Sequence, residues 1–323
     1  MACQGSSCLD AAGDEEAALM QLKTKPAHDV SANAGGDFNY RSFHVGDWPL
    51  VDVPGAENMC DGNTPGGFQS PINIEVAGAS YKKSDIPGPE FYAEEGGCSE
   101  ALFVNKSNTW QVDTYDPGNT EFDVNCPNLV MSWNGKAYEM IQFHFHTLSE
   151  DTFDFQPYAM QMHMVHLAAD GSIAVVGVLI HTDGPKKKQN EFLNELFEIG
   201  FDSTRIVSSP KHKPINPYKA LLKKGGKFWH YPGSLTTPPC SQGLDFFIAK
   251  DPVSVSGTHV ANFMSYLKTR AGNSYGQNHR PIQPLNGREI TVGSWSKVCP
   301  VTGKAPDVGK LNPVLCHFLE EYA

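Results

Sequence analysis

Two histidines in the segment QFHFH at 142–146 are spaced so that they could share one metal ion. Side chains at positions i and i+2 of a β-strand point to the same face of a sheet, so His144 and His146 would lie side by side. His163 lies in the next strand-like segment, and an antiparallel neighbour could bring it alongside the pair. Three imidazoles with an open fourth position are typical of catalytic zinc. His166 lies three residues further on and would face the opposite side of the sheet.

Other interpretations of the same residues exist. Histidines with this spacing also serve as hydrogen-bonding groups in protein cores, without any metal. His144, His146 and Glu150 also match the HxHxxxE pattern of cupins, which would predict manganese or iron on a jelly roll. Against the cupin interpretation, that pattern has glycine six residues before its first histidine, where this chain has Tyr138, and no second half of the motif is present.

The elements around these histidines are predicted to be mainly β-strands. Short runs rich in β-branched and aromatic residues alternate with turn signals such as Asn134-Gly135 and Asp170-Gly171. Two segments with helical periodicity, 187–199 and 258–267, predict helices, and Ser256 is a plausible N-cap of the second. The expected fold is mainly β with peripheral helices. The predicted strands are 101–104, 109–115, 129–133, 138–145, 159–167 and 173–180.

Three regions are expected along the chain. Residues 1–35 are rich in Ala, Gly, Asp and Glu and are interpreted as a flexible N-terminal leader. No linker divides 36–296, which is treated as one domain. Residues 297–323 form a Pro- and Gly-rich C-terminal extension that ends in a possible helical turn. A disulfide between Cys299 and Cys316 would fix this extension in place.

Composition excludes several classes of protein. The 323 residues include 25 Lys+Arg and 36 Asp+Glu, a net charge of −11, so no general attraction to nucleic acid is expected. No stretch approaches the ~18 to 20 apolar residues of a membrane span. The composition names no function and no oligomeric state.

The eight cysteines favour an oxidising compartment. None lies in a CxxC pair, so a zinc ribbon or thioredoxin-type site is not expected, whereas an even number of widely spaced cysteines suits a few disulfides. The first 35 residues lack the apolar core of a secretory signal. Either a leader was removed and the protein is secreted or lumenal, or it is cytoplasmic, which is less favoured, and most cysteines are free.

Three further segments carry a family resemblance: QSPINI at 69–74, YPGSLTTPPC at 231–240 and NHRPIQPL at 278–285. Together with FHFH and HMVH they resemble, in order and spacing, the α-class carbonic anhydrases over roughly 38–296, and bacterial or algal members in particular. The resemblance implies a central, ten-stranded, mostly antiparallel twisted sheet. It also implies a zinc enzyme that reversibly hydrates CO₂ to bicarbonate and a proton through a zinc-bound hydroxide.

The resemblance also assigns roles to residues. His144, His146 and His163 would be the zinc ligands, and Thr236 would accept from the hydroxide while donating to Glu150. An ionised carboxylate can only accept, so Glu150 would fix the direction of the Thr236 proton. Gln142, Gln161 and Asn278 would lie behind the ligands, and Tyr40 at the cavity rim. The substrate pocket would consist of Val165, Val175, Leu235, Thr237 and Leu244.

Three positions depart from the family pattern. Gln161 replaces a usual glutamate, so its carbonyl could still accept a hydrogen bond from a ligand imidazole but without charge, which predicts weaker zinc retention. Asn108 occupies the position of the proton-shuttle histidine and cannot carry protons near neutral pH, so proton transfer should limit turnover. Phe246 stands in place of a tryptophan of the apolar wall, which should be tolerable.

The resemblance further implies a disulfide between Cys60 and Cys240, and less firmly one between Cys98 and Cys126. Asn105-Lys106-Ser107 is a glycosylation sequon, a pattern with many false positives. A second functional hypothesis stays open, namely a catalytically weak or inactive carbonic-anhydrase-like binding or structural protein. Such relatives typically lose ligand histidines, whereas this chain keeps all three.

Overall fold

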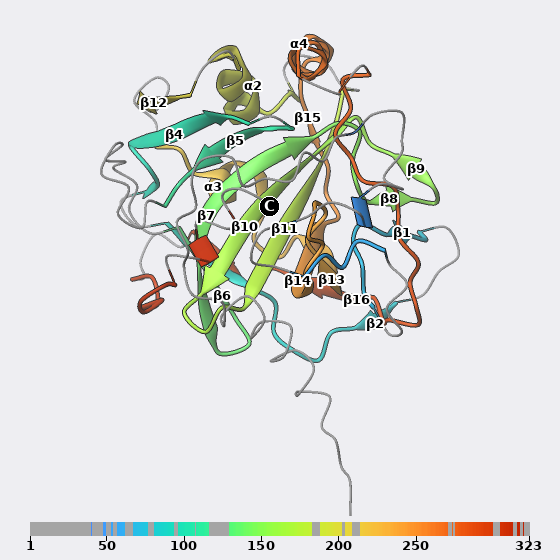
Figure 1. Cartoon of the computed structure of the whole chain (residues 1–323). Coiled ribbons are helices and arrows are strands. Elements are labelled where there is room, and N and C mark those ends of the chain that lie inside the picture. The colour runs from blue at the N-terminus through green and yellow to red at the C-terminus, as the bar shows by residue number, and fades with distance from the viewer. Residues whose placement is uncertain are drawn as a thin grey trace, which may run out of the picture.

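One large twisted sheet runs through the molecule and positions the strands that carry the histidines (Figure 1). The computed structural model describes residues 40, 48–49, 53, 57–61, 67–76, 81–93, 96–106, 108–115, 129–182, 188–201, 204–208, 214–270, 273, 275–299, 304–312, 315–316 and 319. The predicted leader 1–35 lies outside these residues, as does Cys126.

Ten strands of the described chain pair in one continuous order across this sheet, as predicted. Most neighbours are antiparallel, while β11 pairs with β14, and β16 with β2, in parallel. The order is β12 (Arg205–Ser208), β4 (Glu100–Asn105), β5 (Trp110–Asp113), β7 (Lys136–His146), β10 (Met160–Ala168), β11 (Ile173–His181), β14 (Gln242–Ala249), β13 (Lys227–Ser234), β16 (Thr291–Ser294) and β2 (Lys82–Lys83).

Shorter strands extend this path. Branching from it are β3 (Glu90–Ala93), β6 (Leu129–Trp133), β15 (Val253–Ser254) and β17 (Lys297–Val298). A separate small sheet contains β1 (Asn73–Ile74), β8 (Thr152–Phe153) and β9 (Gln156–Pro157). Each of the six strand segments predicted from the sequence overlaps a strand of the structure, although β5 is shorter than the predicted 109–115 and β10 begins one residue later than predicted. The Asn134-Gly135 turn has positive φ at both residues, which explains its sequence signal.

The two predicted helices are confirmed as α2 (Glu191–Glu198) and α4 (Gly257–Lys268), and a short α3 (Pro217–Leu221) was not predicted. Ser256 caps α4 as expected, because its hydroxyl accepts from the Thr258 N–H at 3.3 Å. The side chain of Asn190 caps α2 in the same way, by accepting from the Leu193 N–H at 3.0 Å. No helix within the described residues is long and apolar enough to cross a membrane.

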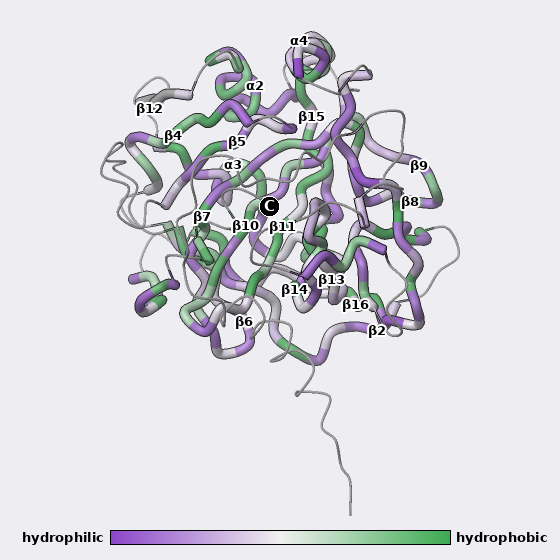
Figure 2. Tube along the Cα trace, in the orientation of Figure 1, coloured by the Kyte–Doolittle hydropathy of each residue, from purple (hydrophilic) through white to green (hydrophobic). Residues whose placement is uncertain are grey.

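The two faces of the sheet bury different kinds of residue. We call the side that packs on the helices the helix face: Phe143 and Phe145 of β7, with Met162 and Met164 of β10, share one apolar cluster with buried side chains of α2, α3 and α4. We call the other side the histidine face. Figure 2 shows hydrophobic stretches interrupted by polar ones along these central strands, as expected for strands whose two faces differ.

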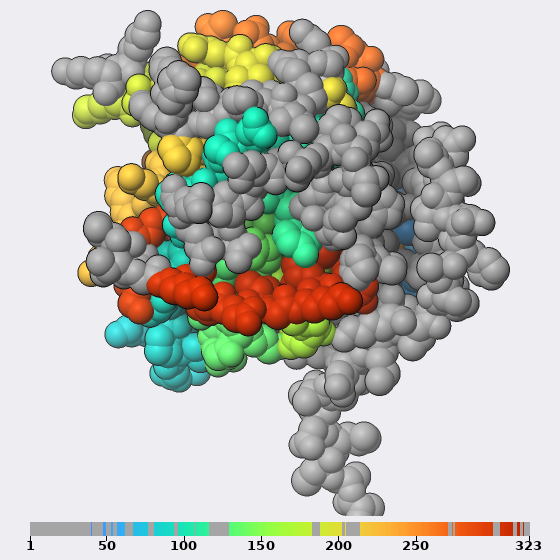
Figure 3. All heavy atoms as spheres, turned by 90° about the vertical axis from the view of Figure 1, so that its left-hand side faces the viewer, coloured from blue at the N-terminus to red at the C-terminus, as the bar shows by residue number. Residues whose placement is uncertain are grey.

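The C-terminal extension has described residues beside the β10–β11 turn, where Gly309 lies next to Ala169, and in the apolar cluster of the histidine face. Figure 3 shows it as a band of red atoms along one side of the molecule. Cys299 is a free thiol beside Asn216, at the edge of the helix-face cluster, whereas Cys316 is buried in the apolar cluster of the histidine face. The disulfide considered between Cys299 and Cys316, whose pairing was left open, is not formed, because the two residues pack in apolar clusters on opposite sides of the sheet.

Two further sequence predictions concern a second disulfide and a glycosylation sequon. Cys98 is disulfide-bonded, while Cys126, its considered partner, is outside the described residues. In the glycosylation sequon, the Asn105 side-chain amide donates to the Phe201 carbonyl at 3.0 Å and accepts from the Tyr266 hydroxyl at 3.0 Å. A sugar would be attached to the same nitrogen that donates to the Phe201 carbonyl, so the structure does not favour modification of Asn105.

Candidate metal centre

The register of β7 against β10 brings the three predicted ligands together. His163 lies directly opposite His144 in this antiparallel pair, and His146 follows two residues along β7 on the same face. The His146 ring centroid lies 4.8 Å from that of His144 and 4.7 Å from that of His163. One ring nitrogen from each histidine lies within 4.8 Å of the other two, and all three side chains are buried.

Hydrogen bonds behind the rings determine which nitrogens remain available. His144 Nδ1 lies 2.9 Å from the Gln142 side-chain carbonyl, and His146 Nδ1 lies 2.8 Å from the backbone carbonyl of Asn278. Carbonyl oxygens only accept, so both Nδ1 atoms carry the proton and both Nε2 atoms present lone pairs. These two Nε2 atoms lie 2.9 Å apart, an arrangement that a shared cation would stabilise.

His163 also has a ring nitrogen that makes no hydrogen bond with the described residues. Its Nε2 is buried without a hydrogen-bond partner among the described residues, and its Nδ1 lies 3.8 Å from Glu150 Oε2. Burial lowers the pKa of His144 and His163 well below the usual value, and lowers that of His146 to about 4. All three imidazoles are therefore neutral at pH 7, the form that binds metal, and imidazole nitrogen suits zinc. The residues present fit a metal ion.

Glu150 lies beside this group and is fully buried. Burial raises its pKa to about 8, while the backbone N–H of Arg280 at 2.9 Å and the Thr236 side chain partly oppose that rise. Glu150 Oε2 has no hydrogen bond of ordinary geometry among the described residues. The structure thus brings the predicted pair of Glu150 and Thr236 within reach of each other, next to the histidines. A divalent cation nearby would favour the ionised carboxylate.

Gln161 contacts different groups from those expected. Its side-chain carbonyl accepts from the backbone N–H groups of Glu150 and Asp151, at 2.9 and 3.0 Å, and its amide donates to Asp151 Oδ2 at 2.8 Å. The hydrogen bond expected from a ligand imidazole is not formed within the described residues. Gln161 instead fixes the backbone that carries Glu150, a role that an isolated sequence gives no sign of.

The predicted apolar residues line neighbouring strands next to His163. Val165 pairs with Val175 across β10 and β11, and Val175 pairs with Phe246 of β14. The Phe246 ring centroid lies 5.9 Å from that of His163. Val165, Val175, Leu235, Leu244 and Phe246 are all buried in one apolar cluster. Thr237 is buried one residue beyond Thr236.

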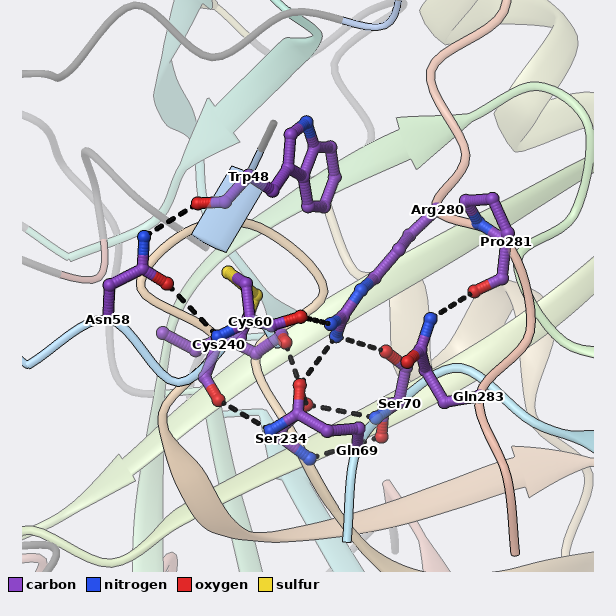
Figure 4. Close-up of a disulfide and its surroundings, with 11 residues drawn as sticks. Trp48, Asn58, Cys60, Gln69, Ser70, Ser234, Cys240, Arg280, Pro281 and Gln283 are labelled. Atoms are coloured by element: carbon purple, nitrogen blue, oxygen red, sulfur yellow. Dashed lines mark hydrogen bonds between the residues drawn. A yellow bond between two sulfur atoms is a disulfide. The ribbon is translucent and has the colours of Figure 1, made fainter. Parts of the chain in front are cut away.

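A buried arginine links the centre to a disulfide, and sequence reasoning missed this residue although it lies in the 278–285 segment. Cys60 and Cys240 are bonded, with Cα atoms 5.0 Å apart, as the resemblance implied. The Arg280 guanidinium donates to the Cys60 carbonyl at 3.2 Å and to Gln69 Oε1 at 2.7 Å (Figure 4). Because the Arg280 backbone N–H also donates to Glu150, one residue ties the Thr236–Cys240 loop to the carboxylate.

The remaining predicted positions surround the centre. The Asn278 side-chain amide donates to the backbone carbonyls of Asn108 and Phe145, at 3.0 and 2.9 Å, so it fixes the carbonyl that orients His146. Asn108 is half-buried. Burial raises the pKa of the Tyr40 hydroxyl well above its ordinary value, and the nearby charge of Glu150 adds to this effect.

Comparisons with known proteins agree with this geometry. Residues 54–294 match the family described as eukaryotic-type carbonic anhydrase. A carbonic anhydrase of Klebsiella pneumoniae is 32% identical over 222 residues, covering 69% of this chain and 78% of that protein. Carbonic anhydrase Cah3 from Chlamydomonas reinhardtii, solved with acetazolamide, has a TM-score of 0.58 and 29% identity, covering 83% of this chain and 99% of that one. The α-carbonic anhydrase from Thermovibrio ammonificans, solved with the inhibitor sulfanilamide, has a TM-score of 0.57 and 28% identity, covering 72% of this chain and 89% of that one.

Proposed function

Since the chain belongs to the eukaryotic-type carbonic anhydrases, we propose that it reversibly hydrates CO₂ to bicarbonate and a proton, with zinc held by His144, His146 and His163. The observation that carries this proposal is the convergence of three buried, neutral imidazoles with nitrogen lone pairs left over. A zinc ion in such a site supplies a nucleophile at neutral pH by lowering the pKa of its water from 15.7 to about 7.

The residues around the centre would each support this reaction. Gln142 and Asn278 hold the two β7 histidines in the tautomer that leaves Nε2 available. An ionised Glu150 accepts a hydrogen bond from the Thr236 hydroxyl. The Thr236 oxygen can then accept a hydrogen bond from the attacking group and orient it. CO₂ has no charge, and the apolar side chains of Val165 and Val175 beside His163 suit such a substrate.

Proton removal would be the slow step. Asn108 occupies the position where the family resemblance predicts a proton carrier, and an amide does not titrate near neutral pH. Each turnover releases one proton, so a small buffer molecule from solution would have to take it. The expected result is a kcat that rises with the concentration of imidazole buffer.

The test is stopped-flow CO₂ hydration with and without sulfanilamide, together with metal analysis of the purified protein. The expected result is about one zinc per chain and hydration that sulfanilamide suppresses. Zinc without hydration would support the alternative of a weak or inactive binding protein. Manganese or iron in the site would contradict the zinc assignment.

The location that we propose is secreted or lumenal. The Cys60–Cys240 disulfide is the observation in support, because such bonds persist in oxidising compartments. Fractionation of cells that produce the native protein would test this. Recovery of the chain in the cytosol with Cys60 reduced would contradict it.

A further inference from the structure

Three leucines of the C-terminal extension are buried against the histidine face. Leu311, Leu315 and Leu319 are 5%, 4% and 0% exposed, respectively. They share one apolar cluster with Val165, Val175, Leu235, Leu244 and Phe246, the residues that would form the substrate wall. The extension thus contributes apolar side chains to the cluster that a CO₂ pocket would need to keep open.

The path of the extension explains how it reaches this place. Gly309 lies beside Ala169 at the β10–β11 turn, since a Cβ added at Gly309 would come 3.5 Å from the Ala169 Cβ. Asn312 then begins a helical turn, because its carbonyl accepts from the Cys316 N–H at 3.0 Å and its side chain accepts from the Leu315 N–H at 3.4 Å. Leu319, the next described residue, is fully buried in the apolar cluster of the histidine face.

The extension also contacts a residue that orients the metal site. The Gln142 side-chain amide donates to the Leu319 backbone carbonyl at 3.5 Å, while its carbonyl faces His144 Nδ1 at 2.9 Å. Gln142 itself is fully buried. The Gln142 side chain therefore contacts both Leu319 of the extension and His144, a predicted zinc ligand.

From these contacts we propose that the C-terminal extension is an autoinhibitory plug, seated on the apolar side chains beside the three histidines. The proposal rests on the proposed function only in calling these side chains a substrate site. The plug must leave before a ligand larger than CO₂ reaches the metal. Burial of the leucines favours docking and the ordering of the chain opposes it. The proposal requires these two contributions to balance closely enough for docked and released states to coexist.

The first experiment needs neither metal nor catalysis. A synthetic peptide of residues 304–323 is titrated into a metal-free chain that lacks residues 311–323, and into the full metal-free chain. The peptide should bind the shortened chain and not the full chain, where the extension already covers these apolar side chains. Absence of binding to the shortened chain, or equal binding to both, would overturn the proposal.

A second experiment follows entry of sulfanilamide into the zinc-loaded protein. The shortened chain and the variant L315D/L319D should associate with it about tenfold faster than the full chain, corresponding to a released fraction of about a tenth or less in the full chain. The peptide should reverse this gain in the shortened chain. Ile86→Asp introduces a carboxylate at an exposed apolar residue elsewhere and should leave the association rate unchanged.

The outcomes separate the plug from the proposed function. Peptide binding without CO₂ hydration in any form would refute the function and keep the plug. Hydration and sulfanilamide binding at equal rates in the full chain, the shortened chain and L315D/L319D would keep the function and refute the plug. Circular dichroism monitors folding, and loss of the folded state in both altered chains would assign the leucines to the structural core and overturn the proposal.

Discussion

Two histidines three residues apart on β10 lie on opposite faces of the sheet and differ in their hydrogen-bond partners. His166 is on the helix face, where its Nδ1 donates to the Ala174 carbonyl at 3.2 Å and its Nε2 accepts from the Tyr218 hydroxyl at 2.7 Å. His163 is on the histidine face, where its Nε2 has no partner among the described residues. Both rings are equally buried, so burial alone does not identify a metal ligand. The difference lies in the surroundings: both nitrogens of His166 have partners, whereas His163 keeps an unpartnered nitrogen beside two other imidazoles.

The same contrast holds for the two faces as a whole. The helix face buries many aromatic and methionine side chains, and buried His166 there has partners at both nitrogens, although Trp110 Nε1 has none among the described residues. The histidine face buries Glu150 and three imidazoles, and contacts with the described residues leave Glu150 Oε2 and a nitrogen of His163 unsatisfied. Unsatisfied buried polar groups cost stability unless a ligand satisfies them. The histidine face therefore carries the features of a site, and the helix face those of a core.

Replacement of the two histidines would test this contrast most strongly. His163→Ala should lower zinc affinity by at least ~10³-fold, because loss even of a group behind a ligand costs 10–100-fold. His166→Phe should retain zinc at the level of the unaltered chain. Equilibrium dialysis against a zinc chelator measures both. Equal losses in the two variants would show that the faces do not differ as described.

The pH dependence of unfolding gives the next largest effect. Burial lowers the pKa of His166 to about 4, so the folded state favours the neutral ring. As pH falls from about 6.5 to about 4 the unfolded chain takes up the proton first, and up to about 3 kcal/mol of stability is lost. In the metal-free chain, His166→Phe should remove this part of the slope.

At pH 7 the same variant should be less stable by about 1–3 kcal/mol, because the Ala174 carbonyl loses the His166 donor and the Tyr218 hydroxyl keeps only its longer contact with the Leu129 carbonyl, at 3.3 Å. Urea denaturation at pH 7 and pH 5 measures the two free energies of unfolding. A difference between variant and unaltered chain that is the same at both pH values would contradict the pKa of His166.

Asn108→His should change the kcat of CO₂ hydration and leave the free energy of unfolding almost unchanged. A titratable imidazole at this position should raise kcat at low buffer concentration by on the order of tenfold and make kcat less sensitive to added imidazole. Stopped-flow hydration over a buffer series measures this. The free energy of unfolding should stay within about 0.5 kcal/mol, since Asn108 is half-buried and its contact with Asn278 uses only its backbone carbonyl.

The smallest effect should come from a pair that belongs to neither face. Lys136 Nζ lies 2.9 Å from Asp170 Oδ2, with both side chains about half exposed. Lys136→Met should cost no more than about 0.5 kcal/mol in urea denaturation, and less in high salt. The change in the free energy of unfolding of Lys136→Met gives the size of a surface contact, with which the change in His166→Phe can be compared.

The ligand set and the strands that carry it could be predicted from the sequence because both depend on local periodicity. The i, i+2 rule placed His144 and His146 together, and the three-residue step assigned His163 and His166 to opposite faces. The partners of Gln161, the role of Arg280 and the opposite positions of Cys299 and Cys316 could not be predicted, because each depends on segments far apart in the chain.

The Cys60–Cys240 bond has a practical consequence for anyone who produces this enzyme. It closes a loop across 180 residues, a cross-link that stabilises the folded chain by about 5 kcal/mol in the chain-entropy treatment. An expression host with a reducing cytoplasm would deliver protein whose Thr236–Cys240 turn is no longer tethered. Preparations from such a host should be oxidised before their turnover is compared with that of exported material.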